Sequence, residues 1–170
     1  MPFSDTEKES TDTTRRVMAL TSDVRSATID VVKAAQRSLS IFSHQLDPAV
    51  YDRIEFLDAV KHLILTHKFT RVRILLKSPV KEVKHGHRLV EMACRFRTFF
   101  EIRQLSDEFS HHQDAFLIAD ETGVVYQINA DRWEGIADSN APRIAKKYLD
   151  LFELAWAKSH PEPEFSGIYV

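Results

Sequence analysis

The sequence contains one cysteine, four glycines and six prolines among its 170 residues. A lone cysteine, Cys94, excludes an intramolecular disulfide and a cysteine-rich zinc site, and it is typical of a reducing compartment. No apolar run approaches the roughly 18 residues of a membrane-spanning helix. We therefore expect a cytoplasmic protein that needs no disulfide for its stability.

Several common catalytic motifs are also missing. The sequence has no P-loop, no GxGxxG, no HExxH and no GxSxG. Histidines are paired in two expected loops, but pairs of this kind are only a weak sign of a metal site. We expect neither a metal nor a cofactor. The pairs are His85 with His87 and His111 with His112.

What is present is the composition of one ordinary globular domain. Hydrophobic residues make up 44% of the chain, and 11 Phe, 4 Tyr and 2 Trp supply large core side chains. A chain of this length is typical of a single domain. The first fourteen residues are polar, and they lack the basic start and apolar run of a signal peptide. We expect a disordered leader over residues 1–18 and one domain over residues 19–170.

The hydrophobic pattern predicts alternating helices and strands. Ser22 is a candidate N-cap for the first helix. Early alternation favours parallel strands joined by helices, and a turn at Glu121-Thr122-Gly123 favours an antiparallel hairpin. The expected class is α/β, with a mixed β-sheet flanked by helices. Helices are expected from residue 22 and over 54–67, 87–98 and 142–158, strands over 38–44, 71–76, 99–105, 114–120 and 124–129, and an edge strand over 165–170.

Charge is segregated although the formal net charge is only −2. The basic tract, residues 68–103, has ten Lys and Arg against three Glu, which leaves +7. The acidic tract, residues 107–138, has eight Asp and Glu against one Arg, which leaves −7. The tracts either decorate solvated faces and pair with each other, or one of them lines an anion site or docks on a second copy.

Three segments carry candidate functional residues. His112 and Asp114 are two residues apart on an extended segment, which places them on one face within reach of each other; the alternative is an exposed loop with a turn acid. The segment 84–88 opens a helix with basic residues, as an anion site does; the alternative is a basic helix start with a structural acid partner. The loop 131–138 is dense in charge, and it either contacts a ligand or is held by Arg132 clamping Asp138 or Glu134, with Trp133 in the core.

The layout resembles one half of the phospholipase D fold. That superfamily has the signature HxKxxxxD, followed on the next strand by a GSxN-like segment. Here His112 is retained, Asp114 stands in place of the Lys, and the final acid, Asp120, comes one residue late; the second segment keeps only Asn129. The resemblance implies a histidine nucleophile and a neutralising lysine. A carboxylate in that position would repel a phosphate, so we expect no phosphodiester hydrolysis of that type.

A closer resemblance is to a bacterial family of degenerate phospholipase D halves, some of them attached to GNAT acetyltransferase domains. It is carried by Lys84-x-Gly86-His87-Arg88-Leu89, by the loop 131–138 and by Trp156-x-x-Ser159. The resemblance covers residues 20–170. It implies the fold and the kind of domain that accompanies it in the family, and it does not imply a reaction. It also implies a homodimer, because single-half members of the superfamily pair about a two-fold axis.

We therefore expect a pseudoenzyme: a non-catalytic binding or regulatory module that takes an anionic ligand or a partner protein. Two alternatives stay open. One is a residual phosphodiesterase or nuclease using His112, with Asp114 beside it, and the other is an electrostatic nucleic-acid binder using the basic tract. The candidate ligand-binding residues are Lys84, Gly86, His87, Arg88, Arg132 and Glu134.

Overall fold

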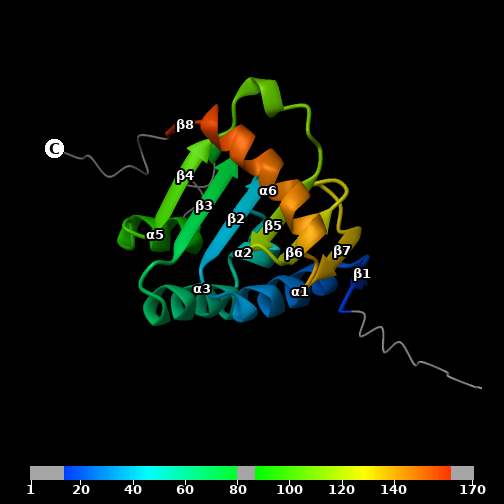
Figure 1. The fold of residues 1–170 in the computed structure, drawn as a ribbon, viewed down its shortest axis with the longest axis horizontal. Helices are drawn as coiled ribbons and strands as arrows, with labels where there is room; N and C mark the ends of the chain where they lie inside the picture. Colours follow the sequence, from blue (N-terminus) through cyan, green and yellow to red (C-terminus); the bar gives the residue numbers. More distant parts are fainter. Residues whose placement is uncertain (1–13, 80–86, 162–170) are drawn as a thin grey trace, which may run out of the picture.

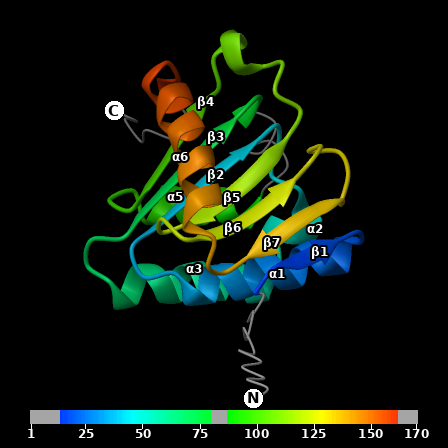
Figure 2. The ribbon, with the colours of Figure 1, turned by 45° about the vertical axis from the view of Figure 1, so that its right-hand side comes forward.

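The protein forms one mixed sheet with helices on both faces (Figures 1 and 2). The structure is a computed structural model that describes residues 14–79 and 87–161. In chain order the elements are β1 (Arg16–Met18), α1 (Thr21–Ala34), β2 (Ser38–Ser43), α2 (Pro48–Tyr51), α3 (Ile54–Thr66), β3 (Arg71–Leu76), α5 (Arg88–Arg95), β4 (Phe100–Gln104), the 3₁₀ turn η1 (Asp107–Phe109), β5 (Ala115–Ala119), β6 (Gly123–Gln127), β7 (Gly135–Asp138), α6 (Pro142–Ala157) and β8 (His160–Pro161).

The sheet has the order β1-β7-β6-β5-β2-β3-β4-β8. Strands β2, β3 and β4 run parallel, and helical segments connect them. Strand β5 lies antiparallel to β2, and β5 and β6 form the expected antiparallel hairpin. The α/β class with a mixed sheet flanked by helices is confirmed.

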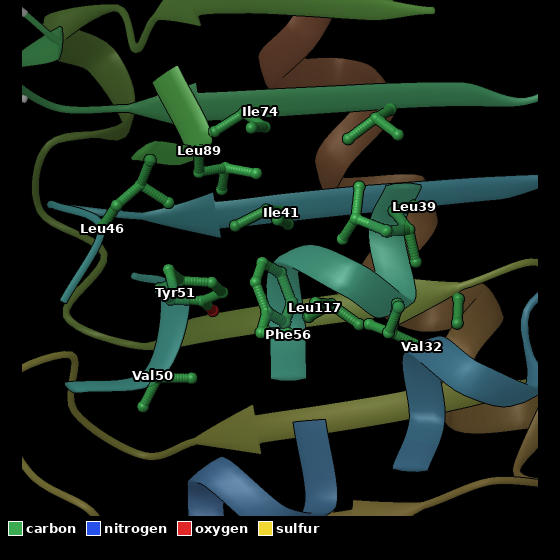
Figure 3. Packing of buried hydrophobic residues seen from close by; sticks show 14 of the residues in the cluster. Val32, Leu39, Ile41, Leu46, Val50, Tyr51, Phe56, Ile74, Leu89 and Leu117 are labelled. Atoms are coloured by element: carbon green, nitrogen blue, oxygen red, sulfur yellow. The ribbon is translucent and has the colours of Figure 1, made fainter. Parts of the chain in front are cut away.

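Two apolar cores lie on opposite faces of the sheet. Central strand β2 is apolar at adjacent positions, so Ile41 faces one core and Phe42 faces the other. Figure 3 shows Ile41 in the larger core with Phe56 of α3 and Leu117 of β5. On the second face, α6 crosses the strands and buries Phe152. Of the described helices, α6 alone covers this face, and α1, α2, α3 and α5 pack on the other.

The start of the domain differs from the expectation. Residues 16–18, at the end of the expected leader, form β1 and pair with β7. The helix α1 begins at Thr21 with Leu20 as its N-cap, not with Ser22. Asp23, in the first turn, accepts the backbone N–H groups of Ala19 and Leu20 and so holds the chain just before the helix.

The expected loop 131–138 also contains a strand, because residues 135–138 form β7. Gly135 permits this pairing: a Cβ there would lie 1.8 Å from the carbonyl oxygen of Tyr126 on β6. The charged residues of segment 131–138 led to the expectation of a loop in place of β7. The expected edge strand over residues 165–170 lies outside the described residues.

Among the described residues, the ion pairs of the basic tract are made with acids outside the acidic tract. Within residues 14–79 and 87–161, no ion pair joins the basic tract to the acidic tract. Four arginines of this tract instead pair with Glu101, Glu153 and Asp52; they are Arg71, Arg73, Arg88 and Arg103. The described residues therefore do not show the internal salt link, which is one of the two alternatives that the sequence leaves open; Arg73 and Arg103 instead contact α6, and Arg71 and Arg103 contact Glu101. None of the helices in the described ranges is long and apolar enough to cross a membrane.

Candidate functional site

His112 and Asp114 lie just before β5, at the sheet edge where β2 ends. The Nδ1 atom of His112 is 3.6 Å from Oδ1 of Asp114, so the structure brings together the two residues that their spacing predicts. Both side chains are largely covered, with 28% and 15% of their surfaces exposed. The charged group facing the imidazole is thus a carboxylate.

The His112 segment is held by its neighbours. His44, which follows β2, donates from Nε2 to the carbonyl oxygen of His112 over 2.6 Å. The ring of His112 lies edge-on to the ring of Phe42, with the ring centroids 6.1 Å apart. It lies nearly parallel to the ring of Phe109, with the centroids 6.2 Å apart. Because these aromatic contacts restrict the ring, its position beside Asp114 is built into the fold.

Asp114 has a second partner on the neighbouring strand. The hydroxyl of Tyr126 on β6 donates to Oδ2 of Asp114 over 3.3 Å. Burial, with contributions from Tyr148 and Asp114, raises the pKa of Tyr126 above its ordinary value, so the phenol stays a neutral donor. Tyr126 stacks on Tyr148 of α6 with ring centroids 4.7 Å apart. The Oδ1 atom of Asp114 is buried without a hydrogen bond in the part of the chain that the structure describes.

The two other residues of the altered motif have structural partners. Asp120 lies at the far end of β5, about 17 Å along a five-residue strand, and accepts the backbone N–H groups of residues 36–38. It has a φ of 55°, which Asp tolerates better than most residues. Asn129 accepts the backbone N–H of Asp131 and so shapes the β6–β7 loop.

The expected anion-binding residues are spread over two places. His87 is the N-cap of α5: it is 3% exposed, and its Nδ1 accepts the backbone N–H of Leu89 over 3.2 Å. Burial lowers the pKa of His87, against the opposing effect of Asp52. Arg88 donates from Nε to Oδ1 of Asp52 over 2.7 Å. Lys84 and Gly86 lie outside the described residues.

Arg132 and Glu134 are both exposed in the loop between β6 and β7. No hydrogen bond or ion pair joins them to His87 or Arg88 within the described ranges. Arg132 does not clamp Asp138; Asp138 instead accepts from the hydroxyl of Thr14 and the backbone N–H of Asn140. Trp133 is half-buried against the larger core, as the structural interpretation of this loop expected.

An apolar cleft adjoins the Tyr126–Tyr148 pair, and nothing in the sequence pattern pointed to it. It has a volume of about 740 Å³ and lies between β1, β6, β7 and the start of α6. Val17 is 82% exposed and Ile128 is 62% exposed at this cleft. Val17 and Ile136 are paired across strands and share the α6 face of the sheet with Tyr126. The sequence did not point to this cleft because Val17 lies in the segment that was expected to be a leader.

No group of three or more metal-ligating side chains is found in the described parts of the chain. The chemistry available at this sheet edge is therefore that of the imidazoles of His44, His111 and His112, one carboxylate and two phenols beside an apolar cleft. Such a set favours hydrogen bonding and apolar contact over the stabilisation of a phosphoryl group, which needs cations.

Solved structures with a similar fold are distant in sequence. TrmBL2, described as an archaeal chromatin protein with a novel mode of DNA binding, has a TM-score of 0.61 at 16% identity over 91% of this chain. This chain spans 57% of the length of TrmBL2. Nuc from Salmonella typhimurium, described as a phospholipase D family member, has a TM-score of 0.58 at 14% identity, and NucT from Helicobacter pylori has 0.59 at 11%. Each match covers 87% of this chain and 98% of the other.

These likenesses show a phospholipase D-like fold and leave the activity open. A comparison of the sequence with curated proteins finds no match. The model of one family, described as a domain of unknown function, DUF7931, matches residues 20–168, which is nearly the whole domain. The chain therefore belongs to the DUF7931 family.

Proposed function

We propose that the protein is a non-catalytic binding or regulatory module on a degenerate phospholipase D-like half-domain. The observation that carries the proposal is the carboxylate of Asp114, 3.6 Å from the imidazole of His112. A negative group about 4 Å from an incoming phosphate costs about 4 kcal/mol at an effective dielectric constant of 20. The electrostatics of this edge therefore oppose an attack of His112 on phosphorus.

Two cations near this edge, Lys158 and Lys147, have other contacts. Lys158 donates to Glu108 over 2.8 Å, and Lys147 lies 5.4 Å from the ring centroid of Tyr148. No Lys or Arg forms an ion pair with Asp114 within residues 14–79 and 87–161. This counts against the alternative of a residual phosphodiesterase, which requires a cation beside His112.

A hydrolysis assay tests the loss of catalysis. Purified, metal-free protein is incubated with bis(p-nitrophenyl) phosphate, and the His112→Ala variant is the comparison. We expect no turnover above the buffer rate in either sample. Turnover that disappears in His112→Ala, while a Glu121→Ala control retains it, would overturn the proposal.

The binding surface we assign to this function is the apolar cleft. On the β3–β4 half of the α6 face, the positions beside the helix carry Arg71, Arg73 and Arg103. On the β6–β1 half, equivalent positions carry Ile136 and Val17. The β6–β1 half therefore exposes apolar side chains where the β3–β4 half carries arginines. Contact with water alone does not explain exposed apolar side chains at these positions.

The partner we propose for this cleft is a second copy of the chain. The cleft is lined by one acid, Glu134, and one base, Lys147, besides its apolar residues. In a two-fold contact each of these would meet its opposite on the other copy, while Val17 and Ile128 of both copies became buried. This agrees with the homodimer that the sequence resemblance implies.

Sedimentation equilibrium of the full chain tests the dimer. The variants Val17→Glu and Ile128→Glu would each weaken self-association at least about tenfold, since each buries a charge in the contact. Leu65→Glu on α3, which is also an exposed apolar position, would leave association unchanged. A wild-type chain that stays monomeric at high micromolar concentration would contradict the dimer.

A second candidate function is electrostatic nucleic-acid binding. It is supported by Lys68, Lys77 and Arg95, which are exposed cations of the basic tract, and by the fold likeness to a DNA-binding chromatin protein. Binding of this kind weakens steeply as salt is added. Duplex binding without a salt dependence would argue against it.

A cytoplasmic location remains our proposal, supported by the single cysteine.

A further inference from the structure

A basic cleft of about 360 Å³ lies between α3 and α5, on the face of the sheet opposite α6. Its charged lining residues are Lys61, Arg88 and Arg95 against one acid, Glu91. Arg88 was expected from the sequence to contact an anion. The structure adds Lys61 and Arg95 to it, two cations that no sequence motif connects with it.

Helical spacing gathers these groups. Arg88, Met92 and Arg95 are four and three residues apart, so they share one face of α5. Leu57 and Lys61 are four residues apart on α3 and face the same cleft. The charges therefore belong to two rigid elements rather than to loops.

The floor of the cleft is apolar. Leu57 is buried, while Met92 and Phe96 are half-buried and pack against the larger core. A ligand in the cleft would place its charged group among the cations and an apolar or planar part over Met92 and Phe96.

Arg88 is already positioned. Its Nε donates to Oδ1 of Asp52 over 2.7 Å, and its Nη2 donates to the carbonyl oxygen of Asp52 over 2.8 Å. A guanidinium has five N–H donors, so others remain for a ligand. Lys61 and Arg95 are exposed, and neither forms an ion pair in the part of the chain that the structure describes. Two unneutralised cations beside a fixed guanidinium suit a multiply charged oxyanion.

We propose that this cleft binds the phosphate group of a ligand, with Lys61, Arg88 and Arg95 as its cations. The proposal rests on the proposed function, in which the chain binds ligands without cleaving them, and it names the class of the expected anion. A phosphate joined to a planar group, as in a nucleotide, fits the apolar floor. The phosphate could belong to a free nucleotide or to a nucleic-acid backbone, which share this chemistry.

Nuclear magnetic resonance of the full-length ¹⁵N-labelled chain tests the site. Inorganic phosphate and AMP are titrated separately, and a labelled single-stranded oligonucleotide is followed by fluorescence anisotropy. We expect shift changes centred on residues 57–61 and 88–96. The double variant Lys61→Glu/Arg95→Glu, which reverses two exposed charges, would weaken binding of every probe that binds by at least about tenfold.

The matched control is Arg143→Glu/Lys146→Glu, which makes the same change in net charge at exposed positions of α6. It should leave the affinity within about twofold if the cleft is the site. Saturable AMP binding without tighter oligonucleotide binding identifies a free nucleotide as the source. Oligonucleotide binding that exceeds AMP binding and falls steeply with salt identifies a backbone.

Two results would overturn the site: no probe binds at millimolar concentration, or the cleft and control variants lose affinity equally. The proposed function fails differently. Hydrolysis that depends on His112 would end the non-catalytic interpretation while leaving phosphate binding between α3 and α5 intact.

Discussion

The imidazole of His112 and the carboxylate of Asp114 lie 3.6 Å apart at the end of the sheet where β2 terminates. Tyr126 donates to the same carboxylate from the next strand, so Asp114 bridges β5 and β6. The residue that stands in place of the lysine of the HxKxxxxD signature is therefore part of a hydrogen-bonded contact between strands. This edge supports the fold and adjoins the apolar cleft.

Removing the Tyr126 hydroxyl tests this contact. Tyr126→Phe would lower the free energy of unfolding by about 1 kcal/mol, because the carboxylate of Asp114 loses its donor in a largely covered position. Urea unfolding measures the change. In an Asp114→Ala background the same substitution would cost less, and a double-mutant cycle with no coupling would contradict the contact.

Asp120 is expected to be a stability residue. Asp120→Ala would cost about 2–3 kcal/mol of unfolding free energy, because the backbone N–H groups of residues 36–38 lose a charged acceptor. Asp120→Asn would cost less, since Asn keeps an acceptor oxygen and tolerates the φ of 55°. Thermal and urea unfolding measure both. Glu121→Ala, at the exposed neighbour, is the control, and an equal loss there would refute the assignment.

Gly135 is expected to tolerate no side chain. Gly135→Ala would destabilise the protein by about 3 kcal/mol or more, because its Cβ would lie 1.8 Å from a backbone carbonyl and would separate β6 from β7. Gly123→Ala would cost about 1 kcal/mol, since its nearest contact is a side-chain methyl of Val31 at 3.0 Å. Chemical unfolding of the two variants gives the comparison. Equal losses would show that β7 does not pair as described.

His87 predicts a pH dependence of stability. Burial lowers its pKa in the folded protein below the ordinary value of 6.5, so the unfolded chain binds the proton more tightly. The contribution of neutral His87 to the free energy of unfolding is fully present above pH 6.5, and it is lost as the pH falls toward the pKa of His87 in the folded protein. Urea unfolding from pH 7.5 to 5 should show wild-type stability falling more steeply than that of His87→Asn, which keeps an N-cap acceptor. Parallel curves would contradict this.

The sequence predicted most of the sheet and all of the long helices, because their apolar periodicities are strong. It also placed His112 beside Asp114, since a spacing of two in extended chain puts both on one side. It missed β1 and β7, which are only three and four residues long. β1 pairs with residues more than a hundred positions away, and local patterns do not record such contacts. β7 pairs with nearby β6, but its four residues are too few to show an alternating pattern.

The sequence by itself determined the fold class, the absence of disulfides and the replacement of a lysine by Asp114. Only the tertiary structure decided which charges meet. Four described arginines of the basic tract meet acids outside the acidic tract, because their strands and helix lie beside α6, β4 and Asp52. Arg88 meets Asp52 and gains Lys61 and Arg95 as neighbours through the packing of α3 on α5, and the apolar cleft appears because α6 leaves β7 and β1 uncovered. Ion pairs and clefts depend on distances of a few ångströms between elements, and those distances are set by packing.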